Sequence, residues 1–164
     1  METVNKNQFI VEERLDTNNK IVGYLYNTNQ RSLSISLLLL RCTIGIILFI
    51  VGSGKVFGWF GGFGMDLTLK FYNQSGISNL FAYMSIYTEF IGGLLLALGF
   101  LTRFVSIAII INMIVATIIS LPNGFLGPNG ASYPFVFLII AITIFLAGPM
   151  SLSIDNIIKK KSFA

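Results

Sequence analysis

The sequence predicts an all-α fold, an integral membrane four-helix bundle with both termini in the cytoplasm. Composition is the first reason: 54% of the 164 residues are hydrophobic and only 11% are charged, and the mean hydropathy is +0.79. A typical soluble domain is about 25% charged, so this chain has too few polar side chains to cover a surface exposed to water. The second reason is the presence of four long apolar runs along the chain.

The apolar runs cover approximately residues 33–57, 80–100, 104–121 and 134–150. A helix needs about 20 apolar residues, with a range of about 17 to 25, to cross the hydrocarbon core of a bilayer. Strands are excluded because lipid admits only helices or closed barrels, and four runs without polar–apolar alternation cannot close a barrel. We therefore expect a polar N-terminal segment 1–32, a transmembrane domain 33–156 and a basic tail 157–164.

Basic residues predict the orientation of the spans. Basic residues are counted on each side of the membrane: segment 1–32 is mixed in charge but carries Lys6, Arg14, Lys20 and Arg31, the link between the second and third runs carries Arg103, and the tail carries Lys159, Lys160 and Lys161, whereas the opposite side has only Lys55 and Lys70. The positive-inside rule then places both termini in the cytoplasm. The short link at Thr102 and Arg103 makes the second and third spans an antiparallel hairpin. The net charge of +4 follows from this topology, so no nucleic-acid partner is expected.

Residue counts remove several kinds of chemistry. The chain has no histidine, which excludes histidine-bound haem, zinc or copper and the commonest general base near neutral pH. Its single cysteine, Cys42, forms neither an internal disulfide nor a thiolate cluster. No catalytic residue, metal site or covalent cofactor is therefore predicted. A redox role requires a redox centre held elsewhere.

Two charged residues inside the apolar runs are the strongest candidates for a site. By helical rise, Arg41 lies about 10 to 12 Å from the cytoplasmic start of its span and Glu89 about 16 Å from the cytoplasmic end of its own. An extended arginine covers that offset, so we expect the two to pair. By the same count Lys55 lies a further ~14 Å toward the outer face, which is too far for a first partner of Glu89.

Polar residues on the other two spans extend this candidate cluster. Asn112 lies between the depths of Arg41 and Glu89, and Thr143 lies near Arg41, so each of the four helices brings a polar group to one level. Lys55, Tyr83, Tyr87 and Arg103 are secondary candidates. One interpretation is a structural ion pair that fixes helix packing. The other is a cavity that receives a polar headgroup or a proton, because ionisable groups inside membranes are commonly functional.

The loop after the first run is aromatic and rich in glycine. Trp59, Phe60 and Phe63 are typical of the aromatic belt at a membrane interface. The following stretch, residues 65–73, predicts a short amphipathic helix that starts near Asp66. We expect this segment to lie at the outer membrane surface.

Three blocks of the sequence resemble the DoxX family of small four-helix membrane proteins, over about residues 33–156. The blocks are Arg41 with Gly45 and then Gly54-Lys55; Glu89-x-x-Gly92-Gly93-x-x-Leu96-x-x-Gly99-x-x-Thr102-Arg103; and Tyr133-Pro134 with Gly148-Pro149, Ser153 and Asp155. The resemblance implies a multi-pass protein of the bacterial inner (cytoplasmic) membrane. It also implies a link to quinone-connected oxidoreductase assemblies, because relatives are named as subunits of terminal or thiosulfate–quinone oxidoreductases.

These observations together lead to three functional hypotheses, of which a small transporter or proton path ranks last because nothing in the sequence marks inverted repeats or helices broken at midplane. The first is an accessory membrane subunit of a redox assembly that binds a quinone near Arg41, Glu89 and Asn112 and docks a partner protein. The second is a non-catalytic scaffold or assembly subunit in which the polar cluster only specifies packing. The sequence leaves open whether the chain is itself an enzyme. Segment 1–32 lies outside the resemblance, and we expect it to dock a partner.

Overall fold

The computed structural model describes residues 30–127, 129–149 and 153–156. The tail predicted at 157–164 and nearly all of the polar segment 1–32 lie outside the described residues, so the predicted docking role of that segment stays a prediction. The chain divides into two units, Met1–Leu33 and Ser34–Ala164.

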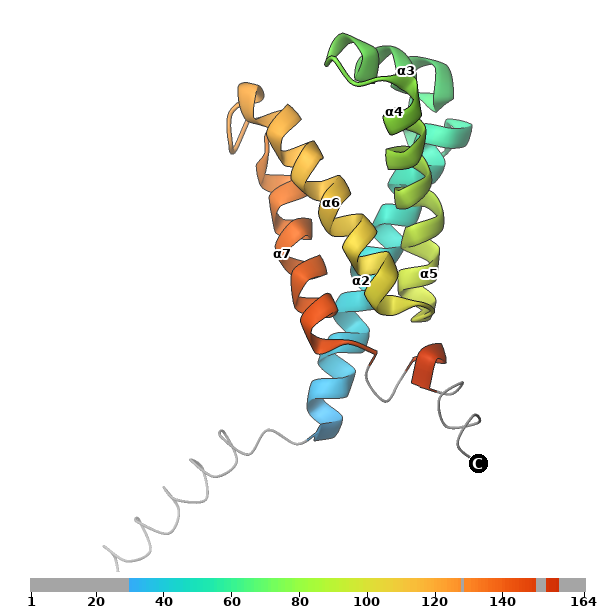
Figure 1. Ribbon diagram of the computed structural model, residues 1–164, viewed down its shortest axis with the longest axis vertical. Helices are drawn as coiled ribbons and strands as arrows, with labels where there is room; N and C mark the ends of the chain where they lie inside the picture. The colour runs from blue at the N-terminus through green and yellow to red at the C-terminus, as the bar shows by residue number, and fades with distance from the viewer. Residues whose placement is uncertain (1–29, 128, 150–152, 157–164) are drawn as a thin grey trace, which may run out of the picture. The chain divides into compact units, whose positions relative to one another are not determined.

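Every regular element among the described residues is helical, which confirms the predicted all-α class (Figure 1). The elements are α2 (Gln30–Phe57), η1 (Trp59–Gly61), α3 (Gly64–Gln74), α4 (Asn79–Tyr87), η2 (Thr88–Gly92), α5 (Gly93–Leu98), α6 (Thr102–Ser120), η3 (Leu121–Asn123) and α7 (Ser132–Ala147). The chain through α4, η2 and α5 forms one continuous rod, so these three elements together correspond to the second predicted span.

Three helical stretches are long and apolar enough to cross a membrane: Ser32–Phe57, Asn79–Leu98 and Thr102–Asn123. The fourth apolar helix, Ser132–Ala147, is shorter. Large apolar side chains such as Leu39, Phe104 and Leu146 are exposed along their outer faces, as expected for surfaces that contact lipid tails. The structure thus supports a multi-pass membrane protein, while the cytoplasmic position of the termini stays a prediction.

Glycines bring α2 into close contact with the α4–α5 rod. A Cβ atom added to Gly45 would lie 2.7 Å from the Gly93 carbonyl oxygen, and one added to Gly52 would lie 2.6 Å from the Phe90 Cα. Such spacing is possible only where a side chain is missing, and small residues serve this purpose in membrane helix packing. These contacts fix the register of α2 against the rod.

A separate set of contacts holds the turn between α5 and α6. Gly99 has φ +71° and Leu101 has φ +50°, so the chain reverses through two left-handed residues. The Asp155 carboxylate accepts hydrogen bonds from the backbone N–H groups of Leu101 at 2.7 Å and Thr102 at 2.9 Å. A carboxylate at this position satisfies free N–H groups at a helix N-terminus. A residue from near the C-terminus therefore caps α6.

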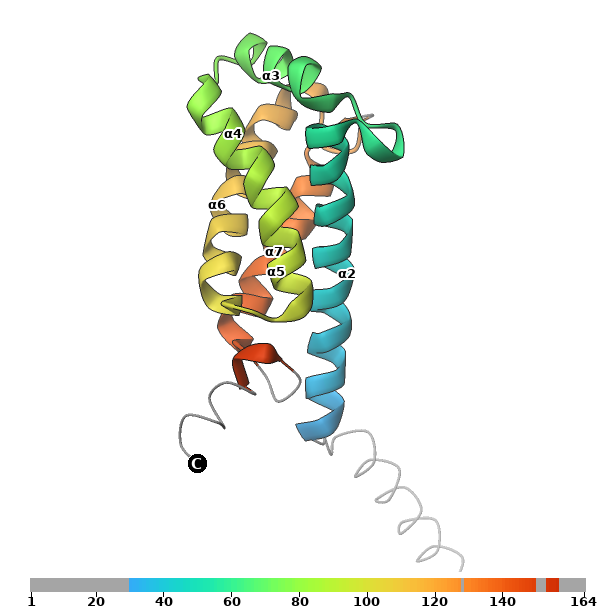
Figure 2. The ribbon, with the colours of Figure 1, turned by 90° about the vertical axis from the view of Figure 1, so that its right-hand side faces the viewer.

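The predicted amphipathic helix at residues 65–73 is confirmed as α3, which crosses the end of α4 (Figure 2). Its buried residues, Thr68 and Tyr72, are four positions apart on one face. Tyr72 packs with Ala82 and Ile86 of α4 in a small apolar cluster. This packing directs the Tyr72 side chain from α3 toward the interior of the unit.

Candidate functional site

Glu89 lies on an unusual turn of the α4–α5 rod. The turn, η2, is π-helical over Thr88–Gly92, and the Glu89 residue is only 4% exposed. A π-helical turn inserts an extra residue into the helical repeat and is frequently found at functional sites. In this chain it directs a carboxylate into the interior of the unit.

The partner of Glu89 is Lys55, whose Nζ lies 2.6 Å from Glu89 Oε2. The Lys55 side chain is 26% exposed and the Glu89 side chain is 5% exposed. The expectation that Lys55 is too far away to be a first partner is therefore wrong. That expectation assumed that the spans start at equal depth. In the structure, the N-terminal part of α2 extends well past the α5–α6 turn (Figure 2). The contact of Gly52 with Glu89 and Phe90 places Lys55 at the level of the carboxylate.

Three further side chains complete a closed polar ring with this ion pair. Lys55 Nζ donates to the Tyr72 hydroxyl at 3.5 Å, and the Tyr72 and Ser85 hydroxyl oxygens are 2.9 Å apart. The Ser85 hydroxyl donates to Asn112 Oδ1 at 2.6 Å, and Asn112 Nδ2 donates to Glu89 Oε1 at 3.4 Å. Lys55, Tyr72, Ser85, Asn112 and Glu89 are hereafter called the polar ring. It joins α2, α3, α4, η2 and α6.

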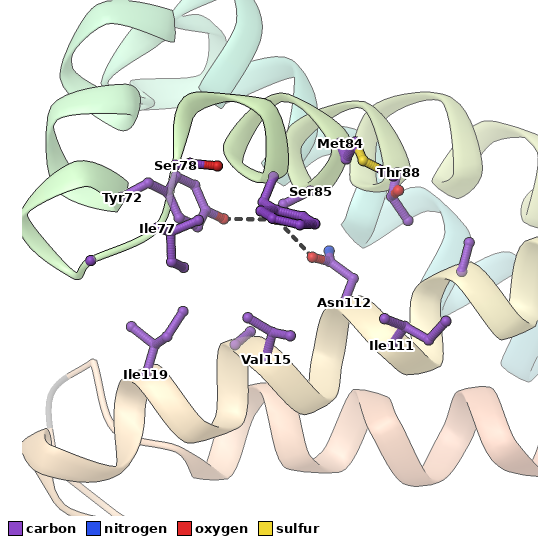
Figure 3. A pocket seen from close by; sticks show the side chains of 14 residues that line it. Tyr72, Ile77, Ser78, Met84, Ser85, Thr88, Ile111, Asn112, Val115 and Ile119 are labelled. Atoms are coloured by element: carbon purple, nitrogen blue, oxygen red, sulfur yellow. Dashed lines mark hydrogen bonds between the residues drawn. The ribbon is translucent and has the colours of Figure 1, made fainter.

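A cavity of about 600 Å³ adjoins the polar ring between α4 and α6 (Figure 3). Tyr72, Ser85 and Asn112 form its polar end. Its other walls are mostly apolar and come from α4, the first residue of η2, the link between α3 and α4, and α6: Ile77, Phe81, Met84, Ala108, Ile111, Val115, Ala116 and Ile119, with Gly76, Ser78 and Thr88. Lys55 and Glu89 do not line the cavity.

The cavity is accessible from the lipid-facing surface of the unit. Phe81, Met84 and Ile111 are 64%, 58% and 59% exposed, respectively, although all three line it. A lining residue that is also exposed marks an open side. Because these helices are long and apolar enough to span a bilayer, the open side faces acyl chains. The volume is within the usual range of about 300 to 1,000 Å³ for small-molecule sites.

Arg41 lies at a different level from Glu89. It is 5% exposed, and a Cβ atom added to Gly99 would lie 2.7 Å from the guanidinium carbon. Gly99 is about 15 Å from Glu89 by helical rise. The structure thus brings Glu89 and Asn112 together, as the sequence suggests, but places Arg41 at the α5–α6 turn.

The remaining predicted residues lie outside the polar ring. Thr143 is exposed and donates to the Ile139 carbonyl of its own helix at 2.9 Å. Tyr83 and Tyr87 are 39% and 44% exposed on α4. Arg103 packs against Gly148, where an added Cβ atom would lie 3.1 Å from Nε. The structure does not bring these four side chains to Glu89.

Sequence reasoning did not select Tyr72 or Ser85 as site residues. Ser85 lies four positions before Glu89, and Tyr72 lies four positions after Thr68 on the buried face of α3. The spacing of Ser85 from Glu89 is thus a signal that the sequence does contain. The approach of Tyr72 depends on how α3 folds over α4, which periodicity alone does not determine.

Comparison with known proteins identifies the family. A model of the DoxX family matches residues 36–122. The chain belongs to the DoxX family. A relative from Bacillus subtilis (strain 168), which carries the name "Putative oxidoreductase CatD", is 32% identical to the DoxX chain over 131 residues, or 79% of this chain and 92% of the relative. No solved structure matches the DoxX chain. All five residues of the polar ring lie within the matched DoxX region.

Proposed function

We propose that this chain is a membrane subunit of a redox assembly and that it binds the headgroup of an isoprenoid quinone in the cavity between α4 and α6. The observation that carries the proposal is the cavity itself, which has apolar walls and a lipid-facing opening and ends at the polar ring. An isoprenoid quinone combines an apolar tail with a ring that carries two oxygens. The family membership and the name of the Bacillus relative support the redox context.

The fit is chemical as well as steric. Tyr72, Ser85 and Asn112 have oxygen and nitrogen atoms at one end of the cavity, where they would hold the oxygens of the headgroup. The walls of α4 and α6 would hold the ring and the first part of the tail. A quinone supplies two-electron redox chemistry when it is bound. The residues of this chain bind it, orient it and exclude water from it.

Electrons must come from another protein. The whole sequence has no histidine and one cysteine, so it has no side chains for a haem, copper or iron–sulfur centre of the usual kinds. This composition favours an accessory role beside a protein that carries its own redox centre. A location in the bacterial inner membrane, with cytoplasmic termini available to such a partner, is part of the proposal.

The alternative is a scaffold subunit in which the polar ring only specifies how the helices pack. One observation favours it: the ring is closed, so each member already contacts two others. A fully satisfied buried network rigidifies a core. A scaffold, however, does not need a lipid-facing cavity beside its network. The two functions therefore differ in whether the cavity is occupied.

Occupancy of the cavity tests the proposed function. Protein purified from a quinone-producing membrane in mild detergent should release isoprenoid quinone on solvent extraction, as measured by mass spectrometry. Ala116→Trp places an indole in the cavity wall and should reduce the quinone-to-protein ratio at least fivefold. Ile118→Trp is the matched control, because Ile118 is 61% exposed on the same helix and does not line the cavity. Equal quinone contents in both variants would support the scaffold instead.

A further inference from the structure

The hydrogens of the polar ring run from Lys55 to Glu89 along both sides of the ring, directly through the ion pair and in one direction through Tyr72, Ser85 and Asn112. Lysine is only a donor, and the carboxylate paired with it is only an acceptor. The Ser85 hydroxyl gives its single hydrogen to Asn112 Oδ1 at 2.6 Å. Tyr72 must therefore be the donor in the 2.9 Å contact with Ser85. The order of donation is Lys55 to Tyr72, Tyr72 to Ser85, and Ser85 to Asn112.

This direction determines what the ring offers to a ligand. The two hydroxyl groups of the polar ring that line the cavity, those of Tyr72 and Ser85, have each given their only hydrogen to the next member of the ring. What they still have is an oxygen lone pair. The Asn112 oxygen also faces Ser85, as Figure 3 shows, while its nitrogen donates to Glu89. The ring hydroxyls at the polar end of the cavity are therefore hydrogen-bond acceptors.

We propose that the cavity selects a ligand that donates a hydroxyl hydrogen, so that it binds a quinol, or another phenol with an apolar substituent, more tightly than the corresponding quinone. This inference rests on the proposed function and specifies the form of the ligand. Lys55 and Glu89 do not line the cavity. They act as positioning residues because their charges fix the direction of donation around the ring.

Replacing the carboxylate by an amide of the same shape should reverse that direction. In Glu89→Gln, the amide oxygen accepts from Lys55 and the amide nitrogen donates toward Asn112. The Asn112 side chain then turns over, since the two ends of an amide are nearly the same size. Its nitrogen donates to Ser85, Ser85 donates to Tyr72, and the Tyr72 hydrogen is released to the cavity. The variant therefore favours a carbonyl acceptor.

The experiment uses decylubiquinol and decylubiquinone as the probe pair, with the full chain in nanodiscs under argon. Isothermal titration calorimetry gives the Kd of each form after subtraction of empty nanodiscs. One net hydrogen bond corresponds to about a tenfold difference in Kd. The wild-type protein should thus bind decylubiquinol about tenfold more tightly, and Glu89→Gln should bring the ratio to one or below.

Two further variants separate hydrogen-bond direction from fold. Tyr72→Phe removes a hydroxyl from the ring but leaves Glu89 to orient Asn112, so the preference for decylubiquinol should persist. If Glu89→Gln does not fold, Ser85→Ala replaces it: without the Ser85 hydroxyl, the Tyr72 hydrogen has no acceptor in the ring and is released to the cavity, and the preference should again be lost.

Different outcomes separate this inference from the proposed function. Equal affinity of the wild-type protein for the two probes, or an unchanged ratio in Glu89→Gln and Ser85→Ala, would overturn the selectivity and leave quinone binding in place. Absence of binding to either probe would overturn both. A ratio that falls equally in Tyr72→Phe and Glu89→Gln would show that the hydroxyl itself, rather than the direction set by the ion pair, selects the ligand.

Discussion

The ion pair between Lys55 and Glu89 should be a main contributor to the stability of the transmembrane unit. Removing one member of a buried pair leaves an uncompensated charge and typically costs about 3 to 5 kcal/mol. The Lys55 side chain is 26% exposed, so water and lipid headgroups reduce that cost. We expect Lys55→Met to lower the free energy of unfolding by about 2 to 3 kcal/mol.

A double-mutant cycle isolates the pair from the other effects of each substitution. The four proteins are the wild type, Lys55→Met, Glu89→Gln and the double variant, and the assay is reversible unfolding by denaturing detergent, followed by circular dichroism. Because the double variant leaves no buried charge, its loss of unfolding free energy should be smaller than the sum of the losses in the two single variants. The expected coupling is about 1.5 to 3 kcal/mol, the upper part of the range for residues in one network.

The control is Lys70→Met, which removes an exposed charge on α3. This change should alter the unfolding free energy by no more than about 0.5 kcal/mol. If Lys55→Met costs as little as Lys70→Met, or if the Lys55 and Glu89 losses simply add, the two residues do not form the pair described above.

Two smaller predictions concern the ends of the spans. Asp155→Ala removes the cap of α6 and should lower the free energy of unfolding by about 0.5 to 2 kcal/mol. Asp66→Ala, at the exposed start of α3, is the control and should cost about half as much or less. Equal losses of unfolding free energy in the two variants would show that the Asp155 cap is unimportant. Trp59, the single tryptophan, is 55% exposed, and its ring centroid lies 4.7 Å from that of Phe57. Lipids brominated near the headgroup should therefore quench its fluorescence more than lipids brominated near the chain end. The reverse order would place this loop in the hydrocarbon core.

The helices could be predicted from the sequence because composition and run length suffice for this step. Apolar runs that lie in lipid must satisfy their own backbone groups, and helices are the local way to do so. The amphipathic helix α3 was predictable for a similar reason, since the buried residues Thr68 and Tyr72 recur at helical spacing. The π-helical turn at Thr88–Gly92 has no comparable signal in the local sequence.

The candidate site could be predicted only in part, because its geometry depends on register. Glu89 and Asn112 were identifiable as polar residues at similar depth, and the structure joins them at 3.4 Å. Lys55, and not the expected Arg41, pairs with Glu89. The error arose because a depth counted from the end of an apolar run assumes that all runs begin at one plane. The close contacts at Gly45 and Gly52 set the true register, and they involve residues on separate helices.

Gly52 is therefore expected to control the polar ring without belonging to it. A Cβ atom there would lie 2.6 Å from the Phe90 Cα, so Gly52→Ala forces α2 away from the rod, and backbone adjustments of this kind cost about 1 to 3 kcal/mol. In the Gly52→Ala background, the coupling between Lys55 and Glu89 should fall by at least half, because the ion pair lengthens. Gly92→Ala is the matched control, since its nearest neighbour would be a Val105 methyl carbon at 3.6 Å, and the coupling should be unchanged. If the coupling energy in the Gly52→Ala background equalled that of the wild type, the side chains of Lys55 and Glu89 would form the ion pair regardless of helix register. The glycine contacts would then serve packing alone.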